Sequence, residues 1–168
     1  MNRATSGLFT AAVLGGLAVA APQTQRYCNA RFGYCVSVPA GLSAQAPPEN
    51  GDGQAWRSAD GPAHVADPVK VSAWGSYGPS VLGLDTPKAY AAWLSSTEKR
   101  QGSRLTYSFF DSTQVVLSGI TRSGRVFYQR VLLHAGTESA VRAEYPVQLK
   151  AVWDRLAVQM AASLTPAR

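Results

Sequence analysis

The sequence has little of three things from which active sites are commonly built: cysteine, histidine and charged side chains. Its 168 residues include two cysteines and two histidines, and 15% of them are Asp, Glu, Lys or Arg. The patterns H-E-x-x-H, G-x-x-x-x-G-K-[ST], G-x-G-x-x-G and G-x-S-x-G are all missing. These absences exclude zinc-protease, phosphate-loop, dinucleotide-binding and nucleophile-elbow motifs. We therefore expect neither a bound metal nor a cofactor.

Long apolar runs are missing as well. The stretch from Gly7 to Ala21 is shorter than the roughly 18–20 apolar residues that cross a bilayer, and Gly15 and Gly16 interrupt it. Residues 1–20 instead follow the order of a secretory signal peptide, with Arg3, an apolar segment and the cleavage pattern Ala18-Val19-Ala20. Cleavage after Ala20 predicts one mature domain, residues 21–168, without a transmembrane segment and located in the periplasm or secreted.

What is present is an apolar, mildly basic composition. Hydrophobic residues make up 46% of the chain, and 16 Lys and Arg against 10 Asp and Glu give a net charge of +6. This composition is typical of a globular protein rather than a disordered one. The basic excess permits an anionic partner, but the basic residues are dispersed and form no run. An export signal also argues against nucleic acid as the partner.

The two cysteines lie close together, in the segment from Cys28 to Cys35. In an oxidising compartment such a pair predicts a disulfide. A hairpin with a four-residue loop, residues 30–33, places Asn29 opposite Tyr34 and Cys28 opposite Cys35. Directly opposed strand residues have Cα atoms about 4.5–5.5 Å apart, which is within disulfide range. A metal site would need more ligands nearby, and a redox pair favours C-x-x-C.

The turn and cap residues, together with the periodicity of apolar residues, predict a mixed order of strands and helices. The first helix begins at the N-cap Thr86 with Pro87 in its first turn, and Gly102 follows its end. Its apolar stripe is Tyr90, Trp93, Leu94 and Thr97. The other expected elements are short strands at 54–58 and 69–74, a loop at 75–83, strands at 105–110, 114–121, 125–134 and 139–145, and a second helix at about 146–163.

The last four strands follow one another with short turns, which predicts an antiparallel meander. A two-residue turn at Ser123-Gly124 places Ile120 opposite Phe127 and Gly119 opposite Tyr128, whose ring then covers the glycine. Both faces of this hairpin are largely apolar. We therefore expect central strands that are covered on both sides.

Turn and cap signals also occur in a recognisable order over nearly the whole mature chain. They are Arg31-Phe32-Gly33-Tyr34, Val38-Pro39, Asn50-Gly51-Asp52-Gly53-Gln54, Asp60-Gly61, Ser118-Gly119, Gly124-Arg125-Val126-Phe127-Tyr128, Tyr145-Pro146 and Ala162-Ser163-Leu164. In this order the chain resembles the PsbP-like α/β/α sandwich superfamily, in particular its small exported bacterial domains of unassigned activity. The resemblance implies an α+β fold, with an antiparallel β-sheet flanked by helices, and an exported location. It implies no catalytic residues, and the cysteine pair is a local departure from the pattern.

Catalytic or metal-binding readings of individual residues find little support. Asn50, Asp52 and Asp60 do not have the spacing of a calcium-binding EF-hand and are better explained as turn residues. His134 ends a strand and His64 lies in a proline-bounded loop, so neither is placed as a general base.

The residues least explained by the fold are Trp74, Tyr77, Arg122, Arg125 and Arg130. Aromatic rings and arginine guanidinium groups are typical of interfaces, so these five are the predicted binding residues. The corresponding hypothesis is a non-enzymatic exported module that binds an envelope protein or an anionic envelope component. Two alternatives stay open at this point: a small periplasmic hydrolase that uses carboxylates or a histidine, and an inhibitor or immunity protein.

Overall fold

The structure is a computed structural model that describes residues 23–59, 68–84, 86–134 and 136–167. The predicted signal peptide, residues 1–20, lies outside the described residues. The same is true of Asp60 and His64.

Two sheets and three α-helices make up the described chain. The elements in order are β1 (Thr24–Asn29), β2 (Tyr34–Pro39), β3 (Leu42–Ala44), β4 (Gly53–Ser58), β5 (Lys70–Ser76), α1 (Gly78–Val81), α2 (Pro87–Arg100), β6 (Arg104–Phe110), β7 (Gln114–Ile120), β8 (Arg125–His134), β9 (Thr137–Pro146), the 3-10 turn η1 (Val147–Leu149), α3 (Lys150–Ala162) and β10 (Thr165–Pro166).

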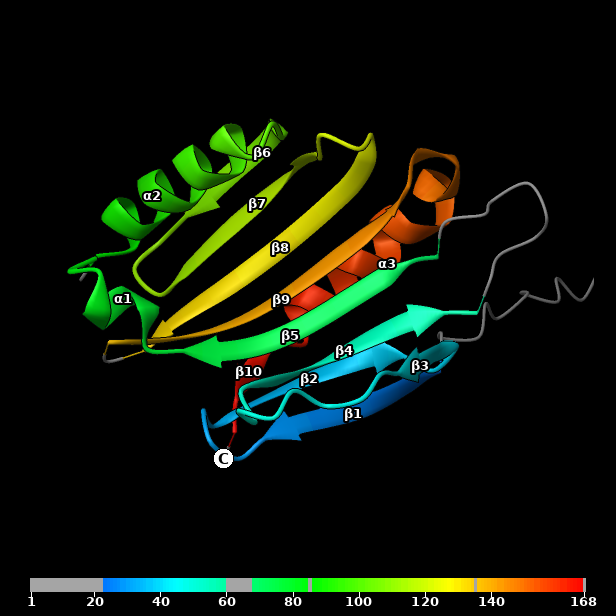
Figure 1. The fold of residues 1–168 in the computed structure, drawn as a ribbon, viewed down its shortest axis with the longest axis horizontal. Helices are drawn as coiled ribbons and strands as arrows, with labels where there is room; N and C mark the ends of the chain where they lie inside the picture. Colours follow the sequence, from blue (N-terminus) through cyan, green and yellow to red (C-terminus); the bar gives the residue numbers. More distant parts are fainter. Residues whose placement is uncertain (1–22, 60–67, 85, 135, 168) are drawn as a thin grey trace, which may run out of the picture.

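The larger sheet has seven antiparallel strands in the order β3-β4-β5-β9-β8-β7-β6 (Figure 1). The smaller sheet has the order β1-β2-β10. The strands from β6 to β9 are neighbours in the order of the chain, so the predicted meander is confirmed. Its outer strand β9 then pairs with β5, which comes much earlier in the sequence.

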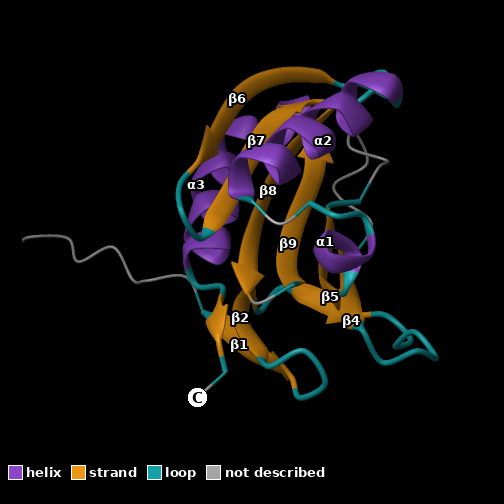
Figure 2. Cartoon of the chain, turned by 90° about the vertical axis from the view of Figure 1, so that its left-hand side faces the viewer, coloured by secondary structure: helices purple, strands orange, loops and turns teal. Residues whose placement is uncertain are grey.

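The large sheet lies between helices (Figure 2). On one face, here called the α2 face, Tyr90 and Leu94 of α2 pack against Leu117, Phe127 and other buried apolar side chains. On the opposite face, here called the α3 face, residues of α3 and the hairpin β1-β2 form a second core with Val141. The fold is therefore α+β, with an antiparallel sheet flanked by helices, as expected.

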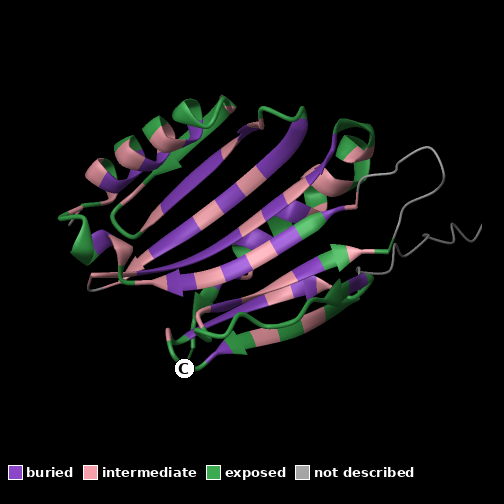
Figure 3. Cartoon of the chain, viewed as in Figure 1, coloured by how far each residue is buried: buried purple, intermediate pink, exposed green. Residues whose placement is uncertain are grey.

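Strands at the centre of the sheet are buried on both faces. Along β8, Val126, Phe127 and Val131 are buried although they point to different sides, and Figure 3 shows the same strand largely in the buried and intermediate colours. This pattern is what apolar residues at consecutive positions predict for a covered strand.

The first hairpin forms as predicted. Cys28 lies opposite Cys35, Asn29 lies opposite Tyr34, and the two cysteines form a disulfide. The loop between them includes Gly33 with a φ of 60°, a conformation that favours glycine.

Helix α2 also begins where its cap predicts. The hydroxyl oxygen of Thr86 accepts a hydrogen bond from the backbone N–H of Ala89, and Gly102 adopts a φ of 85° after the helix. The buried stripe differs in part, because Glu98 is buried where Thr97 was expected. Its carboxylate is held by an arginine of the sheet.

The predicted register of the β7-β8 hairpin is wrong by one residue. Ile120 lies opposite Val126, and Gly119 lies opposite Phe127, because the turn has three residues rather than two. Thr121 donates its N–H to the carbonyl of Arg125, its side chain accepts from the N–H of Arg125, and Gly124 has a φ of 79°. The ring at Gly119 is consequently that of Phe127 and not of Tyr128.

Two other boundaries were predicted imperfectly. The second helix was expected from about residue 146, but residues 147–149 form a 3-10 turn and α3 itself is Lys150–Ala162. The expected loop at 75–83 instead contains the end of β5 and the single turn α1.

Candidate functional site

Part of the α2 face carries polar rather than apolar side chains. In β4, β5 and β9 successive residues alternate between the two faces, so Val71 and Ala143 enter the core of the α3 face. The intervening residues point the other way. They are Ala55 and Arg57 of β4, Lys70 and Ser72 of β5, and Arg142 and Glu144 of β9.

Arg142 is the centre of this polar strip. Its Nη1 lies 2.5 Å from Glu98 Oε1 of α2 and donates to Gln129 Oε1 at 2.9 Å. Its Nε donates to Glu144 Oε1 at 2.8 Å, and its guanidinium lies 4.3 Å from the centre of the Phe127 ring. These contacts hold the guanidinium in one place, with 15% of the side chain exposed. Arg142 therefore connects α2, β8 and β9 through its guanidinium group.

Arg125 closes the same network from the start of β8. It is buried, and its Nη2 donates to the carbonyl oxygens of Pro68 at 2.7 Å and Glu144 at 2.9 Å. Its Nε lies 4.0 Å from Glu144 Oε2. Glu144 thus faces two arginines.

Two hollows lie on either side of Arg142 and Glu144. The first, of about 410 Å³, is lined by Gln45, Ala55, Trp56, Arg57, Lys70, Val71, Ser72, Arg142 and Glu144. The second, of about 530 Å³, is lined by Gln101, Ser103, Thr121, Arg122, Ser123, Arg142 and Glu144. Arg142 and Glu144 line both hollows, and the two hollows together are here called the basic groove. It runs across the strands from β4 to the β7-β8 turn, a span on the order of 20 Å at about 4.8 Å per strand.

The lining of the basic groove is strongly positive. It contains four cationic side chains, Arg57, Lys70, Arg122 and Arg142, and one carboxylate, Glu144. Arg57, Lys70 and Arg122 are exposed, and none of them forms a hydrogen bond or ion pair with another described residue. Three charges are thus available to a ligand, above a floor that is already neutralised.

The positions of Arg57 and Lys70 also favour an anionic ligand. The two residues lie directly opposite each other in the β4-β5 ladder. Like charges in this position destabilise a sheet, and an anion placed between them removes the repulsion. Lys70 also lies opposite Glu144, but that carboxylate is held by Arg142 and Arg125.

A second polar cluster lies at the other end of the α2 face. The carboxylate of Glu138 is buried and accepts hydrogen bonds from Trp74 Nε1 at 3.2 Å, Ser76 Oγ at 2.9 Å and the hydroxyl of Tyr90. Burial raises the pKa of Glu138, although the bonds from Ser76 and Trp74 act in the opposite direction. This carboxylate joins β5, β9 and α2, and it does not line the basic groove.

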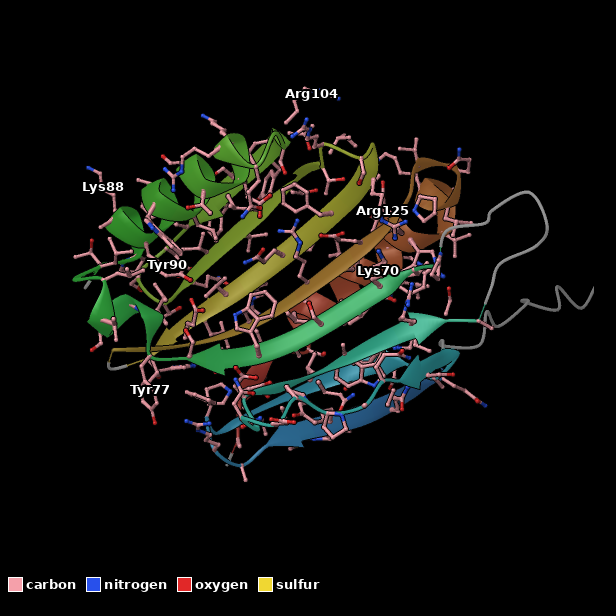
Figure 4. The ribbon with its side chains drawn as sticks, viewed as in Figure 1. Lys70, Tyr77, Lys88, Tyr90, Arg104 and Arg125 are labelled. Atoms are coloured by element: carbon pink, nitrogen blue, oxygen red, sulfur yellow. A yellow bond between two sulfur atoms is a disulfide. The ribbon has the colours of Figure 1, made fainter. Side chains whose placement is uncertain are left out.

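The five predicted binding residues do not form one surface. Trp74 and Tyr77 lie at the end of β5 where Ser76 pairs with Glu138, whereas Arg125 pairs with Pro146. Eight residues of β9 separate these positions, which is about 26 Å at about 3.3 Å per residue. Figure 4 shows Tyr77 at one end of the sheet and Lys70 with Arg125 at the other.

Each of the five has its own environment. Tyr77 is 53% exposed, and the centre of its ring lies 5.1 Å from the centre of the Phe32 ring, while Trp74 donates to the buried Glu138. Arg122 lines the basic groove and Arg125 lies beneath it. Arg130 points to the α3 face, where it donates to carbonyl oxygens at the end of α3.

Arg57 and Lys70 were missed by sequence reasoning. A signal for them exists, because each stands beside a large apolar residue in an alternating strand, Trp56 and Val71. Alternation shows that they leave the core, but only the pairing of β4 with β5 shows that they meet. Arg142 was not among the predicted binding residues either, and in the structure it pairs with Glu144.

The described part of the chain shows no metal site and no membrane-spanning helix. Residues 23–59, 68–84, 86–134 and 136–167 contain no group of three His, Cys, Asp or Glu side chains arranged to hold a metal ion. None of the described helices has the length and apolar character needed to span a membrane. His134 is half-buried at the end of β8 and does not line the basic groove.

Comparisons with known proteins bear on the fold. No protein-family model matches the sequence, and no curated protein matches it. Among solved structures, cyanobacterial PsbP (CyanoP) from Synechocystis sp. PCC 6803 superposes with a TM-score of 0.60 at 16% identity, covering 91% of this chain and 98% of that one. The chain has a PsbP-like fold. The Ran-binding protein Mog1p of Saccharomyces cerevisiae is also similar, with a TM-score of 0.56, 10% identity, and coverage of 87% and 96%.

At 16% and 10% identity, both likenesses concern the fold. The disulfide between Cys28 and Cys35 is compatible with export, because disulfides persist in oxidising compartments.

Proposed function

We propose that this protein is an exported, non-enzymatic accessory module of the cell envelope that captures an acidic, extended segment of another protein in the basic groove. The single observation that carries the proposal is the row of exposed cations, Arg57, Lys70 and Arg122, along a groove with a neutralised floor. None of the three forms a hydrogen bond or ion pair with another described residue. Exposed cations of this kind attract carboxylates and steer their approach.

The groove suits a polypeptide in length and in chemistry. A span on the order of 20 Å corresponds to about six residues of extended chain. Amide and hydroxyl groups of Gln45, Ser72, Gln101 and Ser103 also line the groove. These groups both donate and accept hydrogen bonds, as the N–H and C=O groups of a peptide backbone require.

The rigid floor supports binding over catalysis as the proposed role. Arg142 and Glu144 satisfy each other and are held by Glu98, Gln129 and Arg125. The groove therefore offers fixed charges in a preorganised frame, which lowers the entropy lost on binding.

The test uses a fluorescently labelled peptide of six consecutive glutamates and the protein with its native disulfide. The double variant Arg57→Glu, Lys70→Glu is expected to abolish binding. The matched control is Arg26→Glu, Arg155→Glu, which changes net charge equally at exposed positions of β1 and α3. It is expected to bind almost as the unmodified protein does. An equal loss of peptide affinity in both variants would show that only net charge matters, and it would refute the basic groove as the binding site.

Salt dependence and intact mass complete the design. Binding is expected to weaken as salt rises, because exposed charges are screened beyond about 8–10 Å. The exported location is tested by intact-mass measurement on the protein recovered from the envelope. The mass is expected to match a chain that begins at Ala21. A chain that keeps residues 1–20 in that fraction would contradict a cleaved signal.

A further inference from the structure

Strand β6 is the last strand of the large sheet, and no described strand pairs with its outer side. It is seven residues long and exposed at all but one position. Tyr107, Phe109 and Phe110 are 51%, 42% and 46% exposed. Long, apolar, unpaired edge strands are templates for pairing with another strand.

The backbone of β6 has free groups at defined positions. In an antiparallel pair, the hydrogen-bonding groups of successive residues point alternately to the two sides. Asp111 donates its N–H to Gln114 on the β7 side, so Phe109 and Tyr107 also bond toward β7. The N–H and C=O groups of Ser108 and Phe110 therefore point outward.

The usual protection of an edge strand is weak here. Residues 104–110 contain no proline and no lysine, and Arg104 is their one charged residue. A bulge between Leu105 and Tyr107 interrupts the strand near its start only. Beside the edge lies an open hollow of about 620 Å³, lined by Ser95, Lys99 and residues 103–108. Space for another strand is thus present.

From this edge we propose that β6 pairs with β6 of a second copy of the same chain, antiparallel, about a two-fold axis at Ser108. The argument is that this strand is complementary to itself. A two-fold interface requires one patch to fit its own copy, so that residue i meets residue j and j meets i. Residues that lie opposite each other in the two strands must point to the same face of the sheet, and this restricts the register. A two-fold axis at Ser108 meets this condition along the whole strand.

The bulge sets the count along β6. Arg104, Leu105, Tyr107, Ser108, Phe109 and Phe110 occupy consecutive positions against Ile120, Gly119, Ser118, Leu117, Val116 and Val115 of β7. A two-fold axis at Ser108 therefore places Tyr107 opposite Phe109 of the second copy. One step further out, Leu105 lies opposite Phe110 of the second copy. Aromatic and apolar residues thus face each other on both sides of the sheet.

The ends of the paired strands are complementary in charge. With the same axis, Arg104 lies opposite Asp111 of the second copy, and Lys99 borders the same hollow. The hydrogen bonds from Gln114 and Thr113 lower the pKa of Asp111, so this carboxylate is charged at neutral pH. Each copy offers both the cation and the anion, so the pair forms twice. This charge complementarity selects a second copy as the occupant over an unrelated strand.

The resulting dimer has one continuous sheet, and its two basic grooves lie on the same side because the axis is perpendicular to the sheet. A single pair of strands buries less surface than the roughly 1,600 Å² of a standard interface. The dimer is therefore expected to form reversibly, in a concentration-dependent manner. Two grooves on one face would increase the avidity for a partner with two acidic segments.

The decisive variant is Ser108→Cys. A residue on the axis meets itself, with Cα atoms about 5.5 Å apart in a hydrogen-bonded pair, which suits a disulfide. Mild oxidation of the purified protein is expected to give a covalent dimer. The matched control is Ser96→Cys on the exposed side of α2, which is expected to remain monomeric under the same conditions.

Sedimentation equilibrium over a concentration series tests the non-covalent dimer. Phe109→Lys is expected to shift the protein to monomer, whereas Val152→Lys, at an apolar position of α3 that is 59% exposed, is expected to leave the dimer unchanged. A monomer at every concentration, or a dimer that survives Phe109→Lys while Ser108→Cys fails to cross-link, would overturn the proposal. Binding of the hexaglutamate peptide to one groove does not require dimerisation, so Phe109→Lys is expected to retain it.

Discussion

Arg130 Nη1 donates a hydrogen bond to the carbonyl oxygen of Ala161 at 2.8 Å, and so connects β8 to the last turn of α3. The same nitrogen lies 3.3 Å from the carbonyl oxygens of Ala162 and Leu164, and Nε donates to Gln114 at 2.7 Å. A helix leaves its last carbonyl groups without partners, and its carboxyl end is negatively polarised. Arg130 therefore acts as a tertiary C-cap.

We predict that Arg130→Met lowers the free energy of unfolding by about 2–3 kcal/mol, because hydrogen bonds to a charged group are lost in a half-buried place. Urea denaturation followed by circular dichroism measures this. The control Arg155→Met changes an exposed residue of the same helix and is expected to stay within about 0.5 kcal/mol. Equal values for the two variants would show that the contact with α3 contributes nothing.

Glu138 gives a pH dependence of defined sign. Its pKa is raised by burial, so between the ordinary pKa of 4.5 and the raised pKa the folded state binds more protons than the unfolded state. Its contribution to stability is therefore present at low pH and is lost as pH rises through that window. Subtracting the profile of Glu138→Gln from that of the unmodified protein is expected to show this decline, and a rising difference would contradict it.

The Glu138→Gln variant also has a cost that does not depend on pH. Three donors, from Trp74, Ser76 and Tyr90, converge on the two carboxylate oxygens. An amide offers one acceptor oxygen and turns its NH₂ group toward a donor. We expect a loss of about 1–3 kcal/mol above the titration window, measured by urea denaturation. The control Glu49→Gln, at an exposed turn, is expected to be near neutral.

Removal of the disulfide is expected to weaken the protein without unfolding it. For a closed loop of about eight residues, chain entropy predicts a loss of about 2.5 kcal/mol in the variant Cys28→Ala, Cys35→Ala. Reduction of the unmodified protein should lower its melting temperature to a similar degree. Before reduction neither cysteine is expected to react with a thiol reagent. Reactive thiols in the native exported protein would contradict this.

Arg122 and Tyr77 lie at opposite ends of the sheet, so variants at these two positions test two different surfaces. Arg122→Ala is expected to weaken binding of the hexaglutamate peptide, since Arg122 lines the basic groove. Tyr77→Ala is expected to leave peptide binding unchanged but to weaken capture of a whole envelope partner that also reaches the exposed aromatic ring. Both residues are exposed, so each change is expected to alter stability by less than about 1 kcal/mol. Peptide titration and pull-down from envelope extract separate these outcomes.

Much of the fold was predictable because its signals are local. Thr86 followed by Pro87 marks the start of α2, and the spacing of Cys28 and Cys35 places them opposite each other in a hairpin. Such signals depend on a few neighbouring residues and on standard backbone geometry. The apolar character of both sides of β8 similarly predicted a covered central strand.

Local signals failed where two turn geometries compete. Ser123-Gly124 permits a two-residue turn, but the hydroxyl of Thr121 accepts the N–H of Arg125 and favours the three-residue turn. A change of one residue exchanges every cross-strand partner, so the neighbour of Gly119 became Phe127.

Both ends of α2, the hairpin disulfide, the meander and the PsbP-like order of elements were predictable from the amino-acid sequence, because each depends on contacts close in the chain. The candidate site, in contrast, depends on which strands pair in the folded chain. Arg57, Lys70 and Arg142 come from three strands, and they meet because β5 pairs with β4 on one side and with the distant β9 on the other. The same pairing separates Tyr77 from Arg125 along the sheet and assigns Arg130 to the other face. Periodicity shows which side of a strand a residue occupies, but not which strand lies beside it, since that is settled by packing of the whole chain.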